Sequence, residues 1–186
     1  MIQEWDKFKG WSVLEYFLLN PNTRIHINGL ARELKISPRT AHIFCRGYYD
    51  DGLLLGEEIG NIRRFFLNES DSRMVALKRF VGPYLVSDRS HLKPFLDKNK
   101  NVLSVSVYGS FATGEYGDRS DLDILVLTAD EKKLNTNDLA SLELKLGREV
   151  AVTSISFARW RAMERKKNNF FLAVKKNSIL VWGNQI

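Results

Sequence analysis

The chain has 186 residues, of which 44% are hydrophobic and 27% charged, and its formal net charge is +6. This composition excludes a disordered chain and leaves room for one large domain or two compact ones. No apolar run approaches the roughly 18 residues of a membrane span, and an N-terminus containing Glu4 and Asp6 fits neither a secretory signal nor a transit peptide. We therefore expect a cytoplasmic protein that has no membrane partner.

The positive charge is unevenly distributed. Residues 1–70 contain nine basic and nine acidic side chains, whereas residues 71–186 contain 19 basic and 13 acidic ones. Part of the excess clusters at Arg159, Arg161, Arg165, Lys166 and Lys167. Basic clusters are most often solvated helix faces, but this one lies in the half of the chain that also carries the phosphate-binding pattern described below.

Three helices are predicted at the start of the chain. Apolar residues at helical spacing run from Trp5 to Leu18, and Asn20-Pro21-Asn22 ends that helix. A short helix follows from Asn28, its expected cap, to Leu34. A third helix begins at Ser37-Pro38, a cap followed by proline in the first turn, and extends to about Asp50.

The third helix has two different faces. Its expected buried stripe is Ala41, Phe44, Cys45 and Tyr48. The opposite face, at offsets of three, four and seven, consists of Arg39, His42, Ile43 and Arg46. Because Cys45 falls on the buried side, we interpret this single cysteine as an apolar filler rather than a reactive thiol.

Two short β-rich runs come next, at 53–57 and 62–67, separated by residues with the composition of a hairpin connection. Three helices followed by a hairpin resemble the winged helix-turn-helix domains of many prokaryotic regulators, and the resemblance covers residues 1–70. It implies a third helix in the major groove of DNA and a wing on the backbone or minor groove. The residues that it assigns to DNA contact are Arg39, His42, Arg46, Arg63 and Arg64.

A different role remains open for this N-terminal part. It is electrically neutral, and Glu57 and Glu58 lie on the predicted wing. Winged helices also serve as dimerisation or protein-docking modules, so a homodimer is an alternative to a complex with duplex DNA.

Residues 71–86 are predicted to be helical, with an interruption or kink at Gly82-Pro83. A polar, lysine-rich stretch at 93–101 precedes an alternating strand at 102–108. We therefore expect a winged-helix domain at 1–70, a helical linker at 71–95 and a second domain at 96–186.

The chemistry is predicted to lie just after that strand. Gly109-Ser110 offers a flexible backbone, a hydroxyl and exposed amides where a strand could turn into a helix, an arrangement that suits phosphate. Ten residues later, Asp121 and Asp123 open a second apolar run. Side chains alternate along a strand, so these two carboxylates share one face about 7 Å apart. Such a pair can hold a divalent ion that also binds phosphate.

The pattern of strand, Gly-Ser, ten residues, Asp-x-Asp and strand resembles the minimal nucleotidyltransferases of the DNA polymerase β-like superfamily. The resemblance implies a mixed α+β fold in which helices cover one face of a mixed sheet. It also implies that Gly109 and Ser110 hold the triphosphate and that Asp121 and Asp123 bind Mg²⁺ or Mn²⁺. The activity implied is Mg²⁺-dependent transfer of a nucleoside monophosphate from an NTP, with ATP expected, to an acceptor hydroxyl.

The chain departs from the family pattern at one position. The family usually has a third carboxylate on a later strand, as a metal ligand and base, but the expected strand at 148–152 has Ala151 there. Glu149 lies two residues earlier and so on the same face, and its longer side chain is the candidate replacement. Without a replacement, the site would bind metal and nucleotide but lack its base.

Three functions are therefore open. The first is an active nucleotidyltransferase. The second is a DNA-binding regulator whose degenerate transferase domain senses nucleotide. The third follows from the resemblance, because minimal nucleotidyltransferases of this motif often resemble antitoxins that pair with a HEPN-type toxin.

Overall fold

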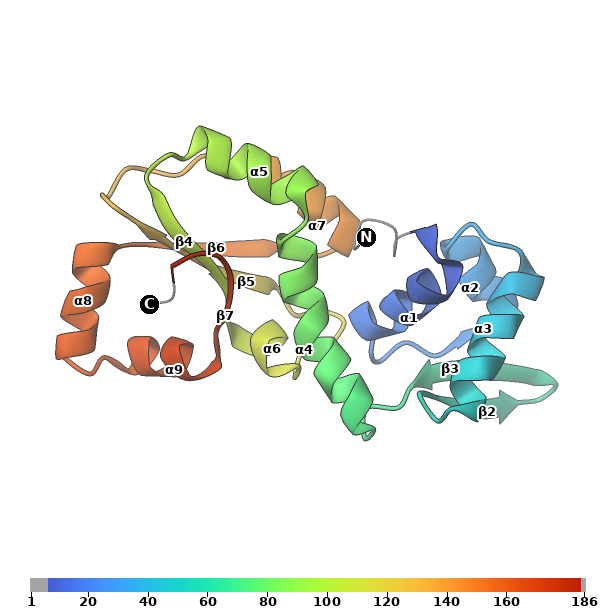
Figure 1. The fold of residues 1–186 in the computed structure, drawn as a ribbon. Helices are drawn as coiled ribbons and strands as arrows, with labels where there is room; N and C mark the ends of the chain where they lie inside the picture. The colour runs from blue at the N-terminus through green and yellow to red at the C-terminus, as the bar shows by residue number, and fades with distance from the viewer. Residues whose placement is uncertain (1–6, 185–186) are drawn as a thin grey trace. The chain divides into compact units, whose positions relative to one another are not determined.

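The computed structural model describes residues 7–184 (Figure 1). The chain divides into two compact units at Lys78 and Arg79, inside the segment expected to be a helical linker. One sheet of three strands belongs to the first unit and one of four strands to the second.

Three helices form most of the first unit: α1 (Lys9–Leu19), α2 (Ile27–Glu33) and α3 (Pro38–Asp50). They lie close to their predicted positions, except that the predicted start of the first helix, at Trp5, lies outside the described residues. The start of α3 is the predicted one, because the Ser37 hydroxyl accepts a hydrogen bond of 3.0 Å from the Thr40 amide. The predicted cap of α2 is wrong. Asn28 lies inside the first turn, and the extended residue before the helix is His26, which makes no side-chain cap.

His26 is extended because it belongs to a strand that the sequence did not reveal. The sheet has the order β1-β3-β2, and its strands are β1 (Ile25–His26), β2 (Leu54–Ile59) and β3 (Ile62–Leu67). Opposite Ile25 in β1 lies Phe65 of β3, which is buried. Two residues are too short to show the alternation by which a strand is recognised, so β1 depends on its partner strand.

The two faces of α3 are those expected from its periodicity. Ala41 and Cys45 are fully buried, and Phe44 and Tyr48 are half-buried and stack at 6.3 Å between ring centroids. Burial raises the pKa of the Cys45 thiol to about 12, which suits an apolar filler. The residues of the opposite face are exposed: Arg39, His42, Ile43 and Arg46.

Two further helices follow, α4 (Ser72–Val86) and α5 (Arg89–Lys98). Pro83 lies within α4 and does not end it. The first part of α5 falls within the helical linker expected at 71–95, but its end was not predicted, since it covers much of the stretch interpreted as polar and contains Pro94. Its start is fixed by the Asp88 side chain, which accepts a 2.8 Å hydrogen bond from the Ser90 amide. No helix within 7–184 is long and apolar enough to cross a membrane.

The second unit is built on a sheet of order β6-β5-β4-β7. Its strands are β4 (Val102–Val107), β5 (Leu122–Thr128), β6 (Val150–Ser156) and β7 (Ile179–Gly183). Strands β5 and β6 are parallel, whereas β4 is antiparallel to both β5 and β7. The sheet is therefore mixed, as predicted.

Helices cover both faces of this sheet, so the expectation of helices on one face is wrong. Leu125 and Leu127 of β5 pack with Trp160 and Phe171 of the C-terminal helices α8 (Phe157–Arg165) and α9 (Asn169–Asn177). On the other side of the sheet lie α5 and α7 (Ala140–Leu146) (Figure 1). Consistent with this, every residue of β5 from Ile124 to Thr128 is buried.

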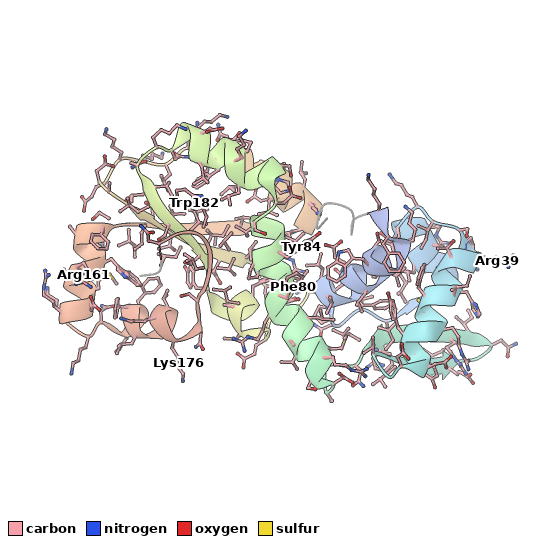
Figure 2. The ribbon with its side chains drawn as sticks, viewed as in Figure 1. Arg39, Phe80, Tyr84, Arg161, Lys176 and Trp182 are labelled. Atoms are coloured by element: carbon pink, nitrogen blue, oxygen red, sulfur yellow. The ribbon has the colours of Figure 1, made fainter. Side chains whose placement is uncertain are left out.

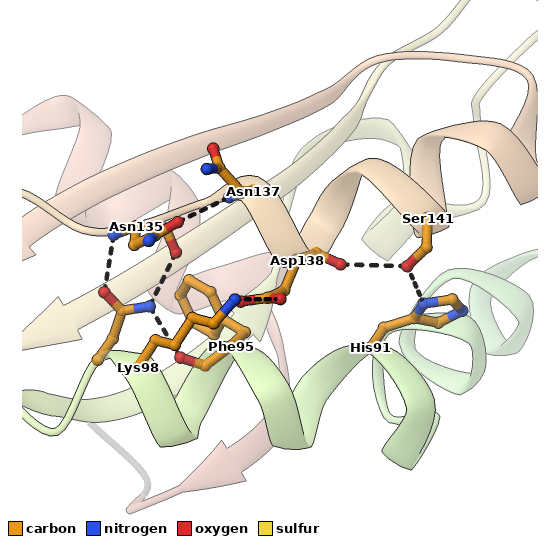
Figure 3. Close-up of polar contacts among 8 residues, drawn as sticks. His91, Phe95, Lys98, Asn135, Asn137, Asp138 and Ser141 are labelled. Atoms are coloured by element: carbon orange, nitrogen blue, oxygen red, sulfur yellow. Dashed lines mark hydrogen bonds and ion pairs between the residues drawn. The ribbon is translucent and has the colours of Figure 1, made fainter.

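The helix α5 is joined by polar contacts to the segment that precedes α7 (Figure 3). The side-chain amide of Asn99 makes three hydrogen bonds. Its Nδ2 donates to the backbone oxygens of Phe95 and Asn135, at 2.8 and 2.9 Å, and its Oδ1 accepts from the Asn135 backbone N–H at 2.8 Å. An ion pair of 2.8 Å joins Lys98 to Asp138 at the one-turn helix η2 (Asn137–Leu139). These contacts fix α5 as part of the second unit.

His91 belongs to the same set of contacts. It is 8% exposed, and its Nδ1 lies 2.7 Å from the Ser141 hydroxyl, which in turn donates to the Asp138 carbonyl (Figure 3). The Ser141 hydroxyl has one proton, which it donates to the Asp138 carbonyl. The Ser141 oxygen therefore accepts the hydrogen bond from His91, and Nδ1 of His91 is the donor. Burial lowers the pKa of His91, against a smaller opposing effect of the Asp88 charge.

We predict that His91 makes the folded state less stable in mild acid. A histidine whose folded pKa is lowered binds fewer protons in the folded than in the unfolded chain, so stability falls as pH drops through the unfolded pKa of about 6.5. Urea denaturation at pH 7.5 and 5.5 should therefore show a smaller acid-induced loss in His91→Gln than in the wild type. Equal losses in the two proteins would contradict this role.

Candidate active site

Strand β4 leads directly into α6 (Gly109–Thr113), and its first residue is a glycine for two physical reasons. The φ angle of Gly109 is +67°, a left-handed conformation that other residues rarely adopt. A Cβ at this position would also lie 2.2 Å from Oδ2 of Asp123. The turn and the carboxylate therefore come together only because residue 109 has no side chain.

The two predicted aspartates lie at the start of β5. Asp123 is the second residue of that strand and Asp121 immediately precedes it, so both project from the face that carries Leu125. Asp121 is exposed and Asp123 is half-buried. Burial raises the pKa of the Asp123 carboxyl, and the negative charge of Asp121 raises it further.

This pair of carboxylates is a suitable donor set for a hard divalent cation. Mg²⁺ and Mn²⁺ prefer oxygen ligands, and Mg²⁺ is commonly held by one or two carboxylates together with substrate phosphates. Oδ2 of Asp123 lies in the space that a side chain at Gly109 would fill. Asp121 and Asp123 are the residues that would hold the ion.

The neighbouring strand places an alanine where a third carboxylate was sought. In the parallel register of β5 and β6, Ala151 pairs with Asp123. Glu149 accepts a 2.9 Å hydrogen bond from the Leu122 amide through its backbone oxygen, and its side chain is exposed. Among residues 7–184, no group of three or more His, Cys, Asp or Glu side chains could hold a metal ion. The role of Glu149 thus stays a prediction.

Arg148 stabilises the loop between the two halves of the motif. The sequence analysis did not identify this residue. Its guanidinium donates to the backbone oxygens of Gly117 and Ser120, both at 3.0 Å. It also lies 5.3 Å from the ring centroid of Phe111, which stacks on Tyr116 at 3.9 Å. Burial lowers the pKa of Arg148. The only sequence signal was a cation at the first position of the strand predicted at 148–152.

A pocket of about 310 Å³ opens beside Gly109 and Ser110. Its other lining residues come mainly from the end of β4, from α6 and from α9: Tyr108, Thr113, Glu115, Phe170, Ala173, Val174 and Asn177. The Tyr108 hydroxyl is held 2.8 Å from the Thr153 hydroxyl, and its ring meets that of Phe170 edge-on at 5.7 Å. The predicted phosphate turn therefore borders a partly aromatic cavity.

The residues predicted to contact DNA lie on two elements of the first unit. On α3, Arg39, His42 and Arg46 are exposed, and on β3, Arg64 is exposed and Arg63 half-buried. Two of these cations have acidic partners in the structure: Arg46 pairs with Asp50 at 3.0 Å, and Arg63 pairs with Glu58.

A groove of about 510 Å³ adjoins these cations. It is lined by His26, Ile27, Asn28, His42, Arg46, Asn61, Ile62, Arg63 and Phe65. The sequence analysis did not include His26 or Asn28 in this surface, because their position depends on the pairing of β1 with β3.

Comparisons with solved structures find chains similar to this one. It is 19% identical to a chain described as a putative nucleotidyltransferase from Sulfolobus solfataricus, over 63% of this chain and 94% of that one, with a TM-score of 0.37. It is 21% identical to a chain of a toxin-antitoxin with AMP-PNP, over 53% of this chain and 75% of that one, with a TM-score of 0.36. No curated protein matches.

The family comparison covers just over half of the chain. Residues 90–184 match the family described as Polymerase beta, Nucleotidyltransferase. The matched region contains nearly all of α5, the whole four-stranded sheet and both halves of the Gly-Ser and Asp-x-Asp motif. The chain therefore belongs to the polymerase beta nucleotidyltransferase family.

Proposed function

We propose that this chain is a Mg²⁺-dependent nucleotidyltransferase that transfers a nucleoside monophosphate from an NTP, expected to be ATP, to an acceptor hydroxyl. The observation that carries the proposal is the contact between Gly109 and the Asp123 carboxylate. It unites a turn suited to phosphate with a carboxylate pair suited to a divalent cation.

Each residue of the motif has a distinct role in this proposal. The backbone of Gly109 and the hydroxyl of Ser110 hold the triphosphate, while Asp121 and Asp123 hold the ion. When bound, the metal neutralises charge on the transferred phosphate and the leaving group. The acceptor oxygen forms a bond to the α-phosphorus, its proton is released, and the bond to pyrophosphate breaks.

The adjacent pocket is proposed to receive the nucleoside. Its volume of about 310 Å³ is at the lower end of the range for small-molecule sites. The rings of Tyr108 and Phe170 offer apolar surface to a base, and Asn177 offers a donor and an acceptor. Because this pocket includes Gly109 and Ser110, a nucleotide could extend from the phosphate turn without crossing the sheet.

The general base is proposed to be Glu149. It lies just before the edge strand β6, two residues before Ala151, and its side chain is exposed. A carboxylate that reaches over the methyl group of Ala151 would accept the proton of the acceptor hydroxyl.

We predict that Asp121→Asn and Asp123→Asn each abolish the Mg²⁺-dependent part of NTP binding. Asparagine keeps the size of the side chain but removes the charge that the ion requires. Calorimetric titration with ATP, GTP, CTP and UTP, with and without Mg²⁺, measures the effect. The control is Asp97→Asn, which removes an exposed carboxylate from α5. Metal-dependent NTP binding that persists in both variants would contradict the proposed site.

We predict that Ala151→Asp increases the rate of transfer by roughly ten- to a hundredfold if Glu149 is a poor base, since a well-placed general base contributes about 10²–10⁴-fold. Pyrophosphate release with ATP and water, or an added hydroxyl acceptor, provides the readout. Glu149→Gln should lower the rate in the wild type and have a smaller effect when it is combined with Ala151→Asp. No release from any of these proteins would favour a nucleotide-binding domain without transfer.

A second candidate function is a DNA-binding regulator whose transferase domain senses nucleotide. Two observations favour it: Ala151 lies beside Asp123, and α3 presents an exposed row of cations next to a groove of about 510 Å³. The order helix, strand, helix, helix and hairpin supports the assignment of the first unit as a winged helix, with α3 entering the major groove.

We predict that the variant Arg39→Gln/Arg64→Gln weakens binding to duplex DNA and lowers its salt dependence by up to about 0.9 per lost phosphate contact. Within residues 7–184, no ion pair engages either arginine, so both are available to phosphate. Fluorescence anisotropy at several salt concentrations provides the measurement, and Arg32→Gln on the exposed side of α2 is the single-substitution control. DNA binding that both arginine substitutions leave unchanged would contradict this candidate.

A further inference from the structure

The two C-terminal helices carry an unusual concentration of charge. Residues 157–177, here called the basic hairpin, contain α8, α9 and the turn between them. They have seven basic side chains, Arg159, Arg161, Arg165, Lys166, Lys167, Lys175 and Lys176, and one acidic side chain, Glu164. The resulting +6 equals the formal charge of the whole chain.

The basic hairpin is held rigidly against the sheet. Trp160, Phe171 and Val174 are buried and pack with residues of β5 and β6. The turn is closed by backbone hydrogen bonds, and the Asn168 side chain caps α9 by accepting from the Phe170 amide at 2.9 Å. The cations are therefore carried by an ordered scaffold, and all seven are exposed.

Most of these cations have no acidic partner within residues 7–184. Glu164 bonds to Arg161 and to Lys175. In the part of the chain that the structure describes, no ion pair involves Arg159, Arg165, Lys166, Lys167 or Lys176. Figure 2 shows Arg161 and Lys176 extending away from the body of the second unit. The surface thus keeps a net positive charge that an anion could neutralise.

The helix α9 joins this charged surface to the proposed active site. Phe170, Ala173, Val174 and Asn177 line the pocket beside Gly109 and Ser110, at the spacing of one helical face. The residues between them, Leu172, Lys175 and Lys176, are exposed. Both the hairpin and the Asp121–Asp123 pair lie on the same face of the sheet as Leu125 and Leu127.

We infer that the acceptor is a single strand of nucleic acid, whose phosphates bind the basic hairpin while one of its hydroxyls enters the active site. This inference rests on the proposed function, for which it names the acceptor class. The acceptor oxygen bonds to the α-phosphorus of the NTP, the hydroxyl proton leaves, and pyrophosphate departs, so the strand gains one nucleoside monophosphate. No further reactant is needed.

Exposed apolar side chains favour a polynucleotide over an acidic protein and a single strand over a duplex. Phe157, 44% exposed, lies one turn before Arg161 and two before Arg165 on α8. Leu172, 49% exposed, lies one turn before Lys175 and Lys176 on α9. Aromatic and apolar groups interleaved with cations suit unpaired bases, which stack or pack there while their phosphates bind the cations.

The turn offers a substitution that removes charge without harming the fold. Lys167 has a φ angle of +49°, a left-handed conformation that a glycine adopts more easily. The test protein is therefore Lys166→Gln/Lys167→Gly. The charge-matched control is Lys93→Gln/Lys100→Gln, which removes two exposed lysines on and just after α5, at the other face of the sheet. Thermal denaturation checks that both variants remain folded.

The measurement is fluorescence anisotropy of a labelled RNA of about 12 nucleotides, within the usual range of single-strand sites, and of the DNA of the same sequence, over a series of salt concentrations without nucleotide. We expect the hairpin variant to bind roughly tenfold or more weakly at about 0.1 M salt, with a salt slope lower by about 1.4, because each single-strand phosphate contact contributes about 0.7. The control should bind like the wild type.

Three results would overturn the inference: equal binding by all three proteins, equal weakening in both variants, or displacement of the RNA by a poly-glutamate peptide at equal charge concentration. Comparison of the affinities for the RNA and for the DNA of the same sequence decides which kind of strand the basic hairpin binds. Titration of the same variants with Mg²⁺–ATP separates this inference from the proposed function, because the hairpin substitutions should leave the affinity for Mg²⁺–ATP unchanged. If the wild-type protein does not bind ATP, the proposed function is refuted, whereas the anisotropy result still shows whether the basic hairpin binds a single strand.

Discussion

The contact between residue 109 and the Asp123 carboxylate depends on strand pairing. Val107 pairs with Ile124, and the Tyr108 amide donates to the Asp123 backbone oxygen at 3.0 Å. These bonds fix how far the end of β4 lies from the start of β5. Any side chain at Gly109 would collide with the carboxylate, and a left-handed φ angle would add strain of about 1–2 kcal/mol. The sheet, more than the connecting loop, thus determines the site, and Arg148 then fastens that loop beside Asp121.

The charged groups of the second unit lie in two sets on different elements. Carboxylates needed for a cation lie at the start of β5, and the basic side chains lie on α8, α9 and their turn. The helix α9 carries part of the basic set and also lines the pocket, with one face on the pocket and the other in solvent. A polyanion on the basic hairpin would therefore be kept apart from the aspartates yet remain next to the nucleotide. That arrangement reduces repulsion between the acceptor phosphates and the carboxylates.

Local signals account for the parts that were predicted from the sequence. Ser37-Pro38 marks the start of α3 because both its cap and its proline act within one turn, and the alternation before Gly109 marks β4. The strand β1 and the end of the helix α5 were missed because their stability comes from partners: Phe65 for Ile25, and Asn135 for Asn99 at the end of α5. Arg148 was missed for the same reason, since its role lies in backbone oxygens about 30 residues away.

The alanine at position 151 does not by itself remove the capacity for transfer. Loss of a general base costs about 10²–10⁴-fold, whereas positioning and electrostatic stabilisation supply much of the acceleration in phosphoryl transfer. The groups proposed for positioning, at Gly109, Ser110, Asp121 and Asp123, are all retained. A site of this composition would therefore bind its nucleotide fully and react slowly, unless Glu149 or a group on the acceptor takes the proton. If transfer is slow, the bound nucleotide stays unreacted until it dissociates, so the enzyme and the nucleotide sensor differ here in rate and share one mode of binding.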